Sequence, residues 1–114
     1  MVQSTDFYTS EVLQCIEYLH GNLILYRDLK PENIMISMLD GGHIKLVDFG
    51  FAKQLQKNNC RTRTKCGTPS YIAPEIIKGD SHSFEVDIWS FGILIYEMLT
   101  GKTPFHDNST AQIY

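Results

Sequence analysis

The residues from Tyr26 to Asn33 place alternating charges in eight consecutive positions, Tyr-Arg-Asp-Leu-Lys-Pro-Glu-Asn. A second polar group, Asp48-Phe49-Gly50, follows fifteen residues after Asn33. An Asp that ends a strand and precedes a glycine can hold a metal ion while the backbone turns freely. Carboxylate and amide oxygens are hard ligands that suit Mg²⁺ beside phosphate oxygens. The two groups therefore predict a magnesium site shared by Asn33 and Asp48, provided that a hairpin joins them.

The segment between the two groups has the pattern of such a hairpin. Residues 34–36 and 44–47 are apolar and strand-like, and Asp40-Gly41-Gly42 between them is a turn signal. The polar residues 48–70 that follow have no hydrophobic period and predict a long loop. Loops of that length are usually functional or disordered.

A helix is expected before the hairpin, over residues 7–20. Its apolar residues fall on one helical face, with Asp6 as a candidate N-cap and Gly21 as the stop.

Two further helices are expected after the loop. Residues 74–77 predict a single turn that begins with a proline. Residues 84–100 predict a long helix, with Gly101 and Pro104 marking its end. Because this helix is apolar on nearly every side, we expect it to be buried all round.

Composition excludes several classes of protein. The 114 residues are 43% hydrophobic and 20% charged, which is enough apolar material for a folded core but for one domain at most. A net charge of −3 disfavours nucleic acid as a partner. Neither a signal peptide nor a membrane span is expected. The cysteines have no C-x-x-C spacing and the histidines no ligand spacing, so reduced thiols in a cytoplasmic protein are favoured over a disulfide or zinc site.

The motifs resemble, in order, those of the C-terminal lobe of a eukaryotic protein kinase. The match consists of Arg27-Asp28-Leu29 with Asn33, then Asp48-Phe49-Gly50, and then Ala73-Pro74-Glu75. Cys66-Gly67-Thr68-Pro69 and the Asp87-x-Trp89-x-x-Gly92 pattern extend it. The resemblance covers residues 1–114 and implies a mainly α fragment of that lobe with a small β-hairpin, within the α+β kinase fold. Lys30, Tyr26 and Gly50-Phe51-Ala52-Lys53 are similar to Ser/Thr kinases of the AGC group, especially those that depend on cyclic nucleotides.

The resemblance implies catalytic roles for three residues. Asp28 would accept the proton of the substrate hydroxyl, and Lys30 would stabilise the transferring phosphoryl group. Thr68 would hydrogen-bond near both and fix the loop.

The cofactors that the resemblance implies are ATP and Mg²⁺. Asn33 and Asp48 would hold the metal ion. Met35 is the expected contact on the floor of the adenine pocket.

The same resemblance implies a regulatory site and a substrate surface. Thr64 aligns with the phosphorylation site of the activation loop, and Arg27 and Lys53 are the cations that its phosphate would recruit. Glu32 and Glu97 match acidic residues that contact a basic residue upstream of the target hydroxyl. The expected partners are protein substrates with basic residues near Ser or Thr, and a cyclic-nucleotide-binding regulatory domain or subunit.

Two residues depart from the family pattern. Lys65 stands where a hydrophobic residue usually lines the pocket after the target site, and Ser70 replaces the usual Glu after Gly-Thr-Pro. The resemblance therefore does not by itself predict an apolar residue at that substrate position.

Other parts of a kinase domain have no counterpart in the sequence. No G-x-G-x-x-G loop and no Val-Ala-x-Lys strand occur, and these cover the nucleotide and its phosphates. We therefore expect the N-lobe and last helices to be absent and the 114 residues alone to be inactive. The alternative is a non-catalytic docking module derived from a kinase lobe. A calcium module around Asp40-Gly41-Gly42 lacks the required row of oxygen ligands.

Overall fold

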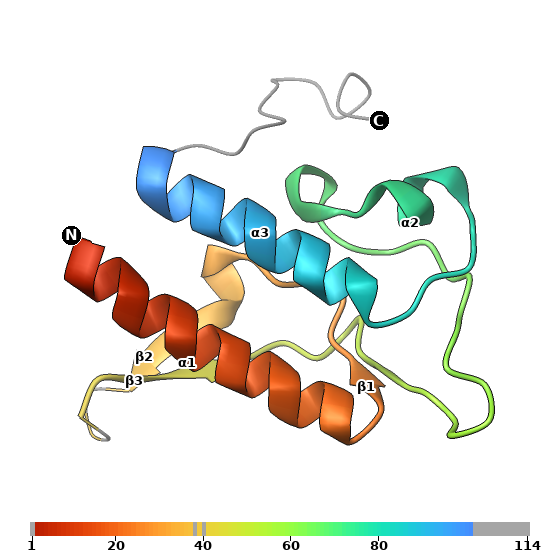
Figure 1. Ribbon diagram of the computed structural model, residues 1–114, viewed down its shortest axis with the longest axis horizontal. Helices are drawn as coiled ribbons and strands as arrows, with labels where there is room; N and C mark the ends of the chain where they lie inside the picture. Colours follow the sequence, from red (N-terminus) through yellow and green to blue (C-terminus); the bar gives the residue numbers. More distant parts are fainter. Residues whose placement is uncertain (1, 38, 40, 102–114) are drawn as a thin grey trace.

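Two long helices lie side by side at the centre of the structure (Figure 1). This computed structural model describes residues 2–37, 39 and 41–101. Helix α1 spans Val2–Gly21, α3 spans Glu85–Thr100, and the short α2 spans Pro74–Lys78. The three helices predicted from the sequence are confirmed.

Helix α1 differs from the prediction at both ends. It begins at Val2, so Asp6 lies within the helix and is not its N-cap. Gly21 is still helical, and the left-handed backbone that redirects the chain is at Leu23, with φ 61°. The backbone N–H of Leu23 donates to the carbonyl of His20 at 3.0 Å. A non-glycine residue thus makes the turn for which the sequence favoured a glycine.

The predicted hairpin is present as strands β2 (Ile34–Ser37) and β3 (His43–Leu46). The strands are antiparallel, with Ile34 opposite Leu46 and Ser37 opposite His43. Of the predicted turn residues, Asp40 lies outside the described residues, whereas Gly41 and Gly42 both adopt positive φ.

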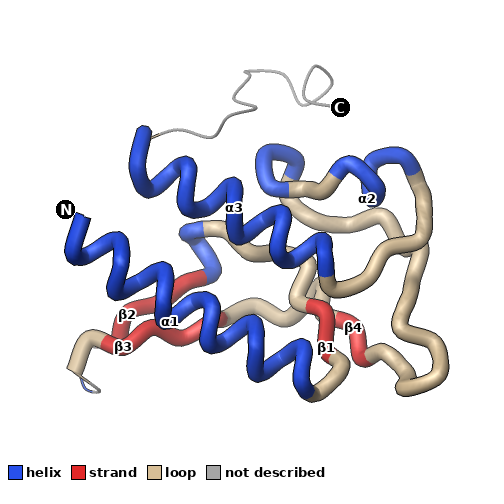
Figure 2. Tube along the Cα trace, viewed as in Figure 1, coloured by secondary structure: helices blue, strands red, loops and turns tan. Residues whose placement is uncertain are grey.

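A second small sheet lies where the sequence predicted only a loop (Figure 2). Strand β4 (Lys53–Gln54) pairs antiparallel with β1 (Ile24–Leu25). Leu55 directly after it is buried, and its N–H donates to the Leu23 carbonyl at 2.7 Å. The prediction of an unbroken loop over residues 48–70 is therefore wrong, because this pairing depends on a partner about thirty residues away.

The core lies between α1, α3 and the β2–β3 hairpin. Its buried members come from all three elements: Val12, Ile16, Leu19, Tyr26, Leu29, Ile44 and Leu94. A smaller cluster of Ala73, Ile76 and Val86 joins α2 to the start of α3. Burying such side chains contributes about 1.5–3 kcal/mol each.

Helix α3 is not buried on every side, contrary to the prediction from its composition. Asp87 and Ser90 face the interior with Leu94, whereas Ile88 is 51% exposed and Leu99 is 63% exposed. Gly101 ends the helix with φ 88° and donates its N–H to the Glu97 carbonyl at 2.8 Å. The predicted stop at Pro104 lies outside the described residues.

Two short 3₁₀ turns lie in the polar loops that contain Asp28 and Thr68. They span Pro31–Asn33 (η1) and Pro69–Tyr71 (η3), each with proline at its start.

All three cysteines are free. No helix among the described residues is long and apolar enough to cross a membrane.

Candidate active site

Three predicted catalytic side chains meet in one hydrogen-bonded cluster. The ammonium of Lys30 donates to the hydroxyl of Thr68 at 2.8 Å, and that hydroxyl donates to Asp28 Oδ1 at 3.0 Å. Lys30 Nζ lies 3.8 Å from the same carboxylate oxygen. Asp28 is buried while Lys30 and Thr68 are partly exposed. Residues forty positions apart thus hold one buried carboxylate with a partly exposed cation beside it.

A buried carboxylate in α3 holds the loop of residues 26–33, which carries Asp28 and is called the catalytic loop below. Asp87 is fully buried, and its two oxygens accept the backbone N–H groups of Tyr26 at 2.9 Å and Arg27 at 2.8 Å. His20 Nε2 lies 2.8 Å from Asp87 Oδ2 and completes the set. The sequence motifs alone indicate no role for Asp87. The available signal was a charged residue within an otherwise apolar helix, since a buried charge needs partners.

The loop that Asp87 holds has an unusual backbone. Arg27 has φ 68° and Asp48 has φ 59°, a region that non-glycine residues rarely adopt. Such conformations cost about 1–3 kcal/mol each and persist only where surrounding contacts enforce them. Here the bonds from Asp87 enforce the first, and an N–H bond from Gly50 to Asp48 Oδ1 at 3.1 Å accompanies the second.

Gly67 permits the close approach of the two loops. It has φ 117°, and a Cβ at this position would lie 3.2 Å from the carbonyl oxygen of Arg27. Any side chain here would push the segment before Thr68 away from the catalytic loop. The glycine therefore favours the close approach of the two loops, because a side chain here would strain the backbone and force the catalytic loop to shift by a few tenths of an ångström.

Asn33 and Asp48 lie at adjacent ends of the hairpin, as predicted. The N–H of Val47, next to Asp48, donates to the Asn33 carbonyl at 2.9 Å. The Asn33 amide nitrogen donates to the Asp28 carbonyl oxygen at 2.7 Å and to Asp28 Oδ2 at 3.0 Å. These bonds direct the amide nitrogen inward and leave its oxygen for a cation. With the exposed Asp48 carboxylate, this oxygen set fits Mg²⁺. No cluster of three His, Cys, Asp or Glu side chains that could hold a metal occurs within the described ranges.

Tyr26 joins the loop that carries Asp28 to the end of the hairpin. Its hydroxyl donates to the Val47 carbonyl, and its ring meets the Phe49 ring edge-on with centroids 5.1 Å apart. Burial raises the pKa of Tyr26 above its ordinary value, and the carboxylates of Asp28 and Asp48 raise it further. The phenol therefore stays neutral. Met35, the predicted adenine contact, is 54% exposed on β2.

Thr64 is exposed, as a modification site requires, and the segment before it is anchored. Thr62 and His82 exchange backbone hydrogen bonds of 2.9 and 2.7 Å, and Arg61 donates to Ser81. These contacts fix the chain two residues before Thr64. Thr62 itself is buried.

The two cations predicted for a phosphate on Thr64 differ in setting. Arg27 is buried, and its Nε donates to the Phe51 carbonyl at 2.7 Å. Its Nη1 is buried without a hydrogen-bond partner in the described part of the chain. Lys53 is exposed on β4.

The acidic residues predicted to contact substrate lie around Tyr71. The Tyr71 hydroxyl donates to Glu97 Oε2 at 2.7 Å, and Glu32 is exposed on the turn η1. Burial raises the pKa of Tyr71, with contributions from its hydrogen bond to Glu97, the Glu97 charge and the Glu32 charge. Glu97 therefore contacts the Tyr71 hydroxyl directly, whereas Glu32, 65 residues earlier, affects its pKa through charge alone. No sequence motif alone indicates this role for Tyr71.

Comparison with known proteins agrees with this geometry. Residues 2–114 match the model of the protein kinase domain. The chain is 53% identical over 112 residues to cAMP-dependent protein kinase catalytic subunit 3 of Drosophila melanogaster, covering 98% of this chain and 18% of that protein. It is 55% identical over 108 residues to the human cAMP-dependent protein kinase catalytic subunit PRKX, covering 95% of this chain and 29% of that protein.

A fungal relative is not named as a cAMP-dependent kinase. The Serine/threonine protein kinase ypkA of Aspergillus fumigatus is 51% identical over 113 residues, covering 99% of this chain and 17% of that protein. The chain thus spans less than a third of the length of each of these three relatives. The predicted α+β kinase fold and the similarity to AGC-type Ser/Thr kinases are confirmed. The chain belongs to the protein kinase domain family.

Proposed function

We propose that this chain carries the phosphotransfer centre of a protein serine/threonine kinase that uses ATP and Mg²⁺. The observation that carries the proposal is the Asp28 carboxylate, which accepts from Thr68 at 3.0 Å with Lys30 Nζ 3.8 Å away. A carboxylate and an ammonium this close together can act on a hydroxyl and on the phosphoryl group that it attacks. A docking module would not require that pairing, which favours the catalytic proposal over the alternative.

Each polar side chain of the cluster has a distinct task in this reaction. Asp28 accepts the proton of the substrate Ser or Thr hydroxyl and orients the oxygen for in-line attack. Lys30 offsets negative charge on the phosphoryl group during transfer. Thr68 holds both side chains in place. The oxygens of Asn33 and Asp48 would hold Mg²⁺, which when bound neutralises phosphate charge. Met35 would contact the adenine of ATP.

The substrates proposed are proteins with basic residues upstream of the target hydroxyl. The carboxylates of Glu32 and Glu97, both of which act on Tyr71, support this preference by charge complementarity. Glu97 is already bound to Tyr71, so a substrate arginine would share it with the phenol.

Regulation is proposed to act through the segment around Thr64. A phosphate there adds roughly −1.5 to −2 charge and would draw on Arg27 and Lys53. Arg27 Nη1, which is buried and has no hydrogen-bond partner among the described residues, supports this role. Regulation by a cyclic-nucleotide-binding domain or subunit is proposed from the names of the relatives. A location in the cytoplasm is proposed from the three free cysteines, which suit a reducing compartment.

The experiment is a phosphate-transfer assay on the full-length protein with labelled ATP and peptides that carry Ser, Thr or Tyr after two arginines. We expect label on the Ser and Thr peptides, none on the Tyr peptide, and loss of transfer when Mg²⁺ is chelated. Transfer independent of Mg²⁺, or none to Ser and Thr, contradicts the proposal. Residues 1–114 alone are expected not to turn over ATP, since the sequence has no glycine-rich phosphate loop.

A further inference from the structure

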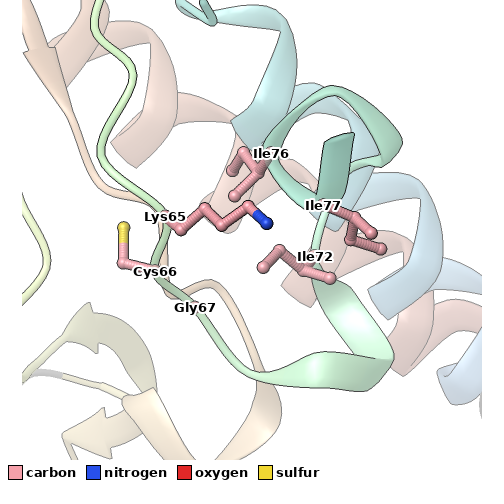
Figure 3. A pocket seen from close by; sticks show the side chains of 6 residues that line it. All are labelled: Lys65, Cys66, Gly67, Ile72, Ile76 and Ile77. Carbon is pink, nitrogen blue, oxygen red and sulfur yellow. The ribbon is translucent and has the colours of Figure 1, made fainter. Parts of the chain in front are cut away.

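An apolar pocket lies between the chain segment that leads to Thr68 and helix α2 (Figure 3). Its volume is about 240 Å³, and it is lined by Lys65, Cys66, Gly67, Ile72, Ile76 and Ile77. The wall residue Gly67 precedes Thr68, whose hydroxyl donates to Asp28. A peptide whose hydroxyl reaches Asp28 therefore has a neighbouring side chain close to this pocket.

Lys65 brings the one charged side chain to a pocket whose other lining residues are apolar or small. Figure 3 shows it extending across the pocket toward the isoleucines. Its Cε lies 3.6 Å from the position that a Cβ on Gly79 would occupy, so its stem reaches from the activation segment to the end of α2. Among the described residues, no carboxylate forms an ion pair with the Lys65 ammonium.

This combination of walls disfavours a purely apolar occupant. A leucine side chain in the pocket would remove water from the Lys65 ammonium and offer it no partner, which costs free energy. A glutamate satisfies both features, because its two methylene groups can contact the isoleucines while its carboxylate pairs with the ammonium. An aspartate has one methylene fewer and gains less of the apolar contact.

We propose that this pocket selects substrates with a glutamate directly after the phosphorylated Ser or Thr, and that Lys65 determines this specificity. The inference rests on the proposed function, in which Glu32 and Glu97 take the basic residues on the upstream side of the target. The substrate residue directly after the target Ser or Thr is then the one that can enter the pocket.

The test compares peptides that differ only in the residue after the target, with Glu, Gln or Leu there, using the full-length protein. We expect kcat/KM for the Glu peptide to exceed that for the Leu peptide by about 3–10-fold, the range of a partly exposed charge pair assisted by apolar contact. Lys65→Leu should abolish or reverse this ratio. Lys78→Leu removes the same charge from the exposed end of α2, outside the pocket lining, and should preserve the ratio.

A charge-reversed variant provides an independent arm. Lys65→Glu should prefer a lysine over a glutamate after the target. Each comparison is a ratio of kcat/KM values for two peptides measured on the same protein. A variant that is less fully folded lowers both values equally, so the ratio is unaffected. The inference is overturned if the wild-type protein prefers Leu, if the Glu preference survives in Lys65→Leu, or if Glu is favoured only before the target. Transfer to peptides without these preferences overturns this inference alone, whereas no transfer to any peptide overturns the proposed function as well.

Discussion

The Asp87 carboxylate in α3 accepts a hydrogen bond from the backbone N–H of Arg27 at 2.8 Å, across sixty residues of sequence. Arg27 precedes Asp28, so the most buried carboxylate of the helix sets the backbone from which the proposed base projects. The same contact holds Arg27 in its left-handed conformation at φ 68°. A buried residue of α3 thus positions the residue proposed as the catalytic base.

Replacing Asp87 by alanine is expected to lower both stability and activity. The N–H groups of Tyr26 and Arg27 would lose their buried acceptor, which costs about 3–5 kcal/mol. That is a large part of a typical domain stability of about 5–15 kcal/mol. Urea unfolding of the full-length protein measures it. Asp80→Ala, which removes an exposed carboxylate seven residues before Asp87 and outside α3, should change stability by less than about 0.5 kcal/mol. Equal losses in the two variants would contradict the positioning role.

Gly67→Ala is expected to separate the two loops of the active site. At φ 117° and with the Arg27 carbonyl oxygen 3.2 Å from the added Cβ, the substitution should cost about 1–3 kcal/mol and reduce kcat more than KM. Gly21→Ala is the matched control, because no atom lies within 4 Å of its added Cβ and its backbone is helical. Thermal unfolding and peptide kinetics on both variants test this. A fully active Gly67→Ala protein would show that the close approach is dispensable.

Thr64→Ala is expected to lower activity if Thr64 carries the regulatory phosphate. Without the phosphate, Arg27 Nη1 keeps no partner and the segment after the Thr62–His82 bonds is not drawn to the catalytic loop. Mass spectrometry of the active protein should find the phosphate on Thr64 and not on the buried Thr62. Full activity in Thr64→Ala, with no phosphate on the wild-type residue, would refute this.

Stability is expected to fall as the pH drops below about 6.5, in part because of His82. This side chain is fully buried with both ring nitrogens unpartnered in the part of the chain described. Burial lowers its pKa from the ordinary value of 6.5, and the Arg27 charge lowers it further, while the Asp80 backbone, Glu85 and Glu75 oppose part of the shift.

The sign follows from proton binding. Below pH 6.5 the His82 imidazole binds a proton in the unfolded chain but stays neutral in the folded protein. The free energy of unfolding therefore decreases as the pH falls, until the pH passes the lowered pKa of His82. His82→Phe should reduce the slope of unfolding free energy against pH between pH 7 and 5, measured by urea unfolding. An unchanged slope would exclude His82 as its source.

Short local patterns explain what the sequence predicted well. The hairpin follows from two apolar segments around glycines, and Asp28, Lys30, Asn33 and Asp48 follow from the order and spacing of their motifs. The contacts of Asp87 were not predictable in this way, because they join α3 to a loop sixty residues earlier. Strand β4 and the Tyr71–Glu97 bond were missed for the same reason. Helix α3 has an apolar composition on all sides, but which side is buried depends on α1 and α2.

The most direct measurement of the central claim is single-turnover phosphate transfer by Asp28→Asn in the full-length protein. Asparagine keeps the shape and can still accept from Thr68, but it cannot take the proton of the substrate hydroxyl. The account predicts a loss of about 10²–10⁴-fold in the rate of transfer with ATP affinity unchanged. Asp80→Asn should transfer phosphate at the wild-type rate. A wild-type rate in Asp28→Asn would contradict the assignment of this cluster as the phosphotransfer centre.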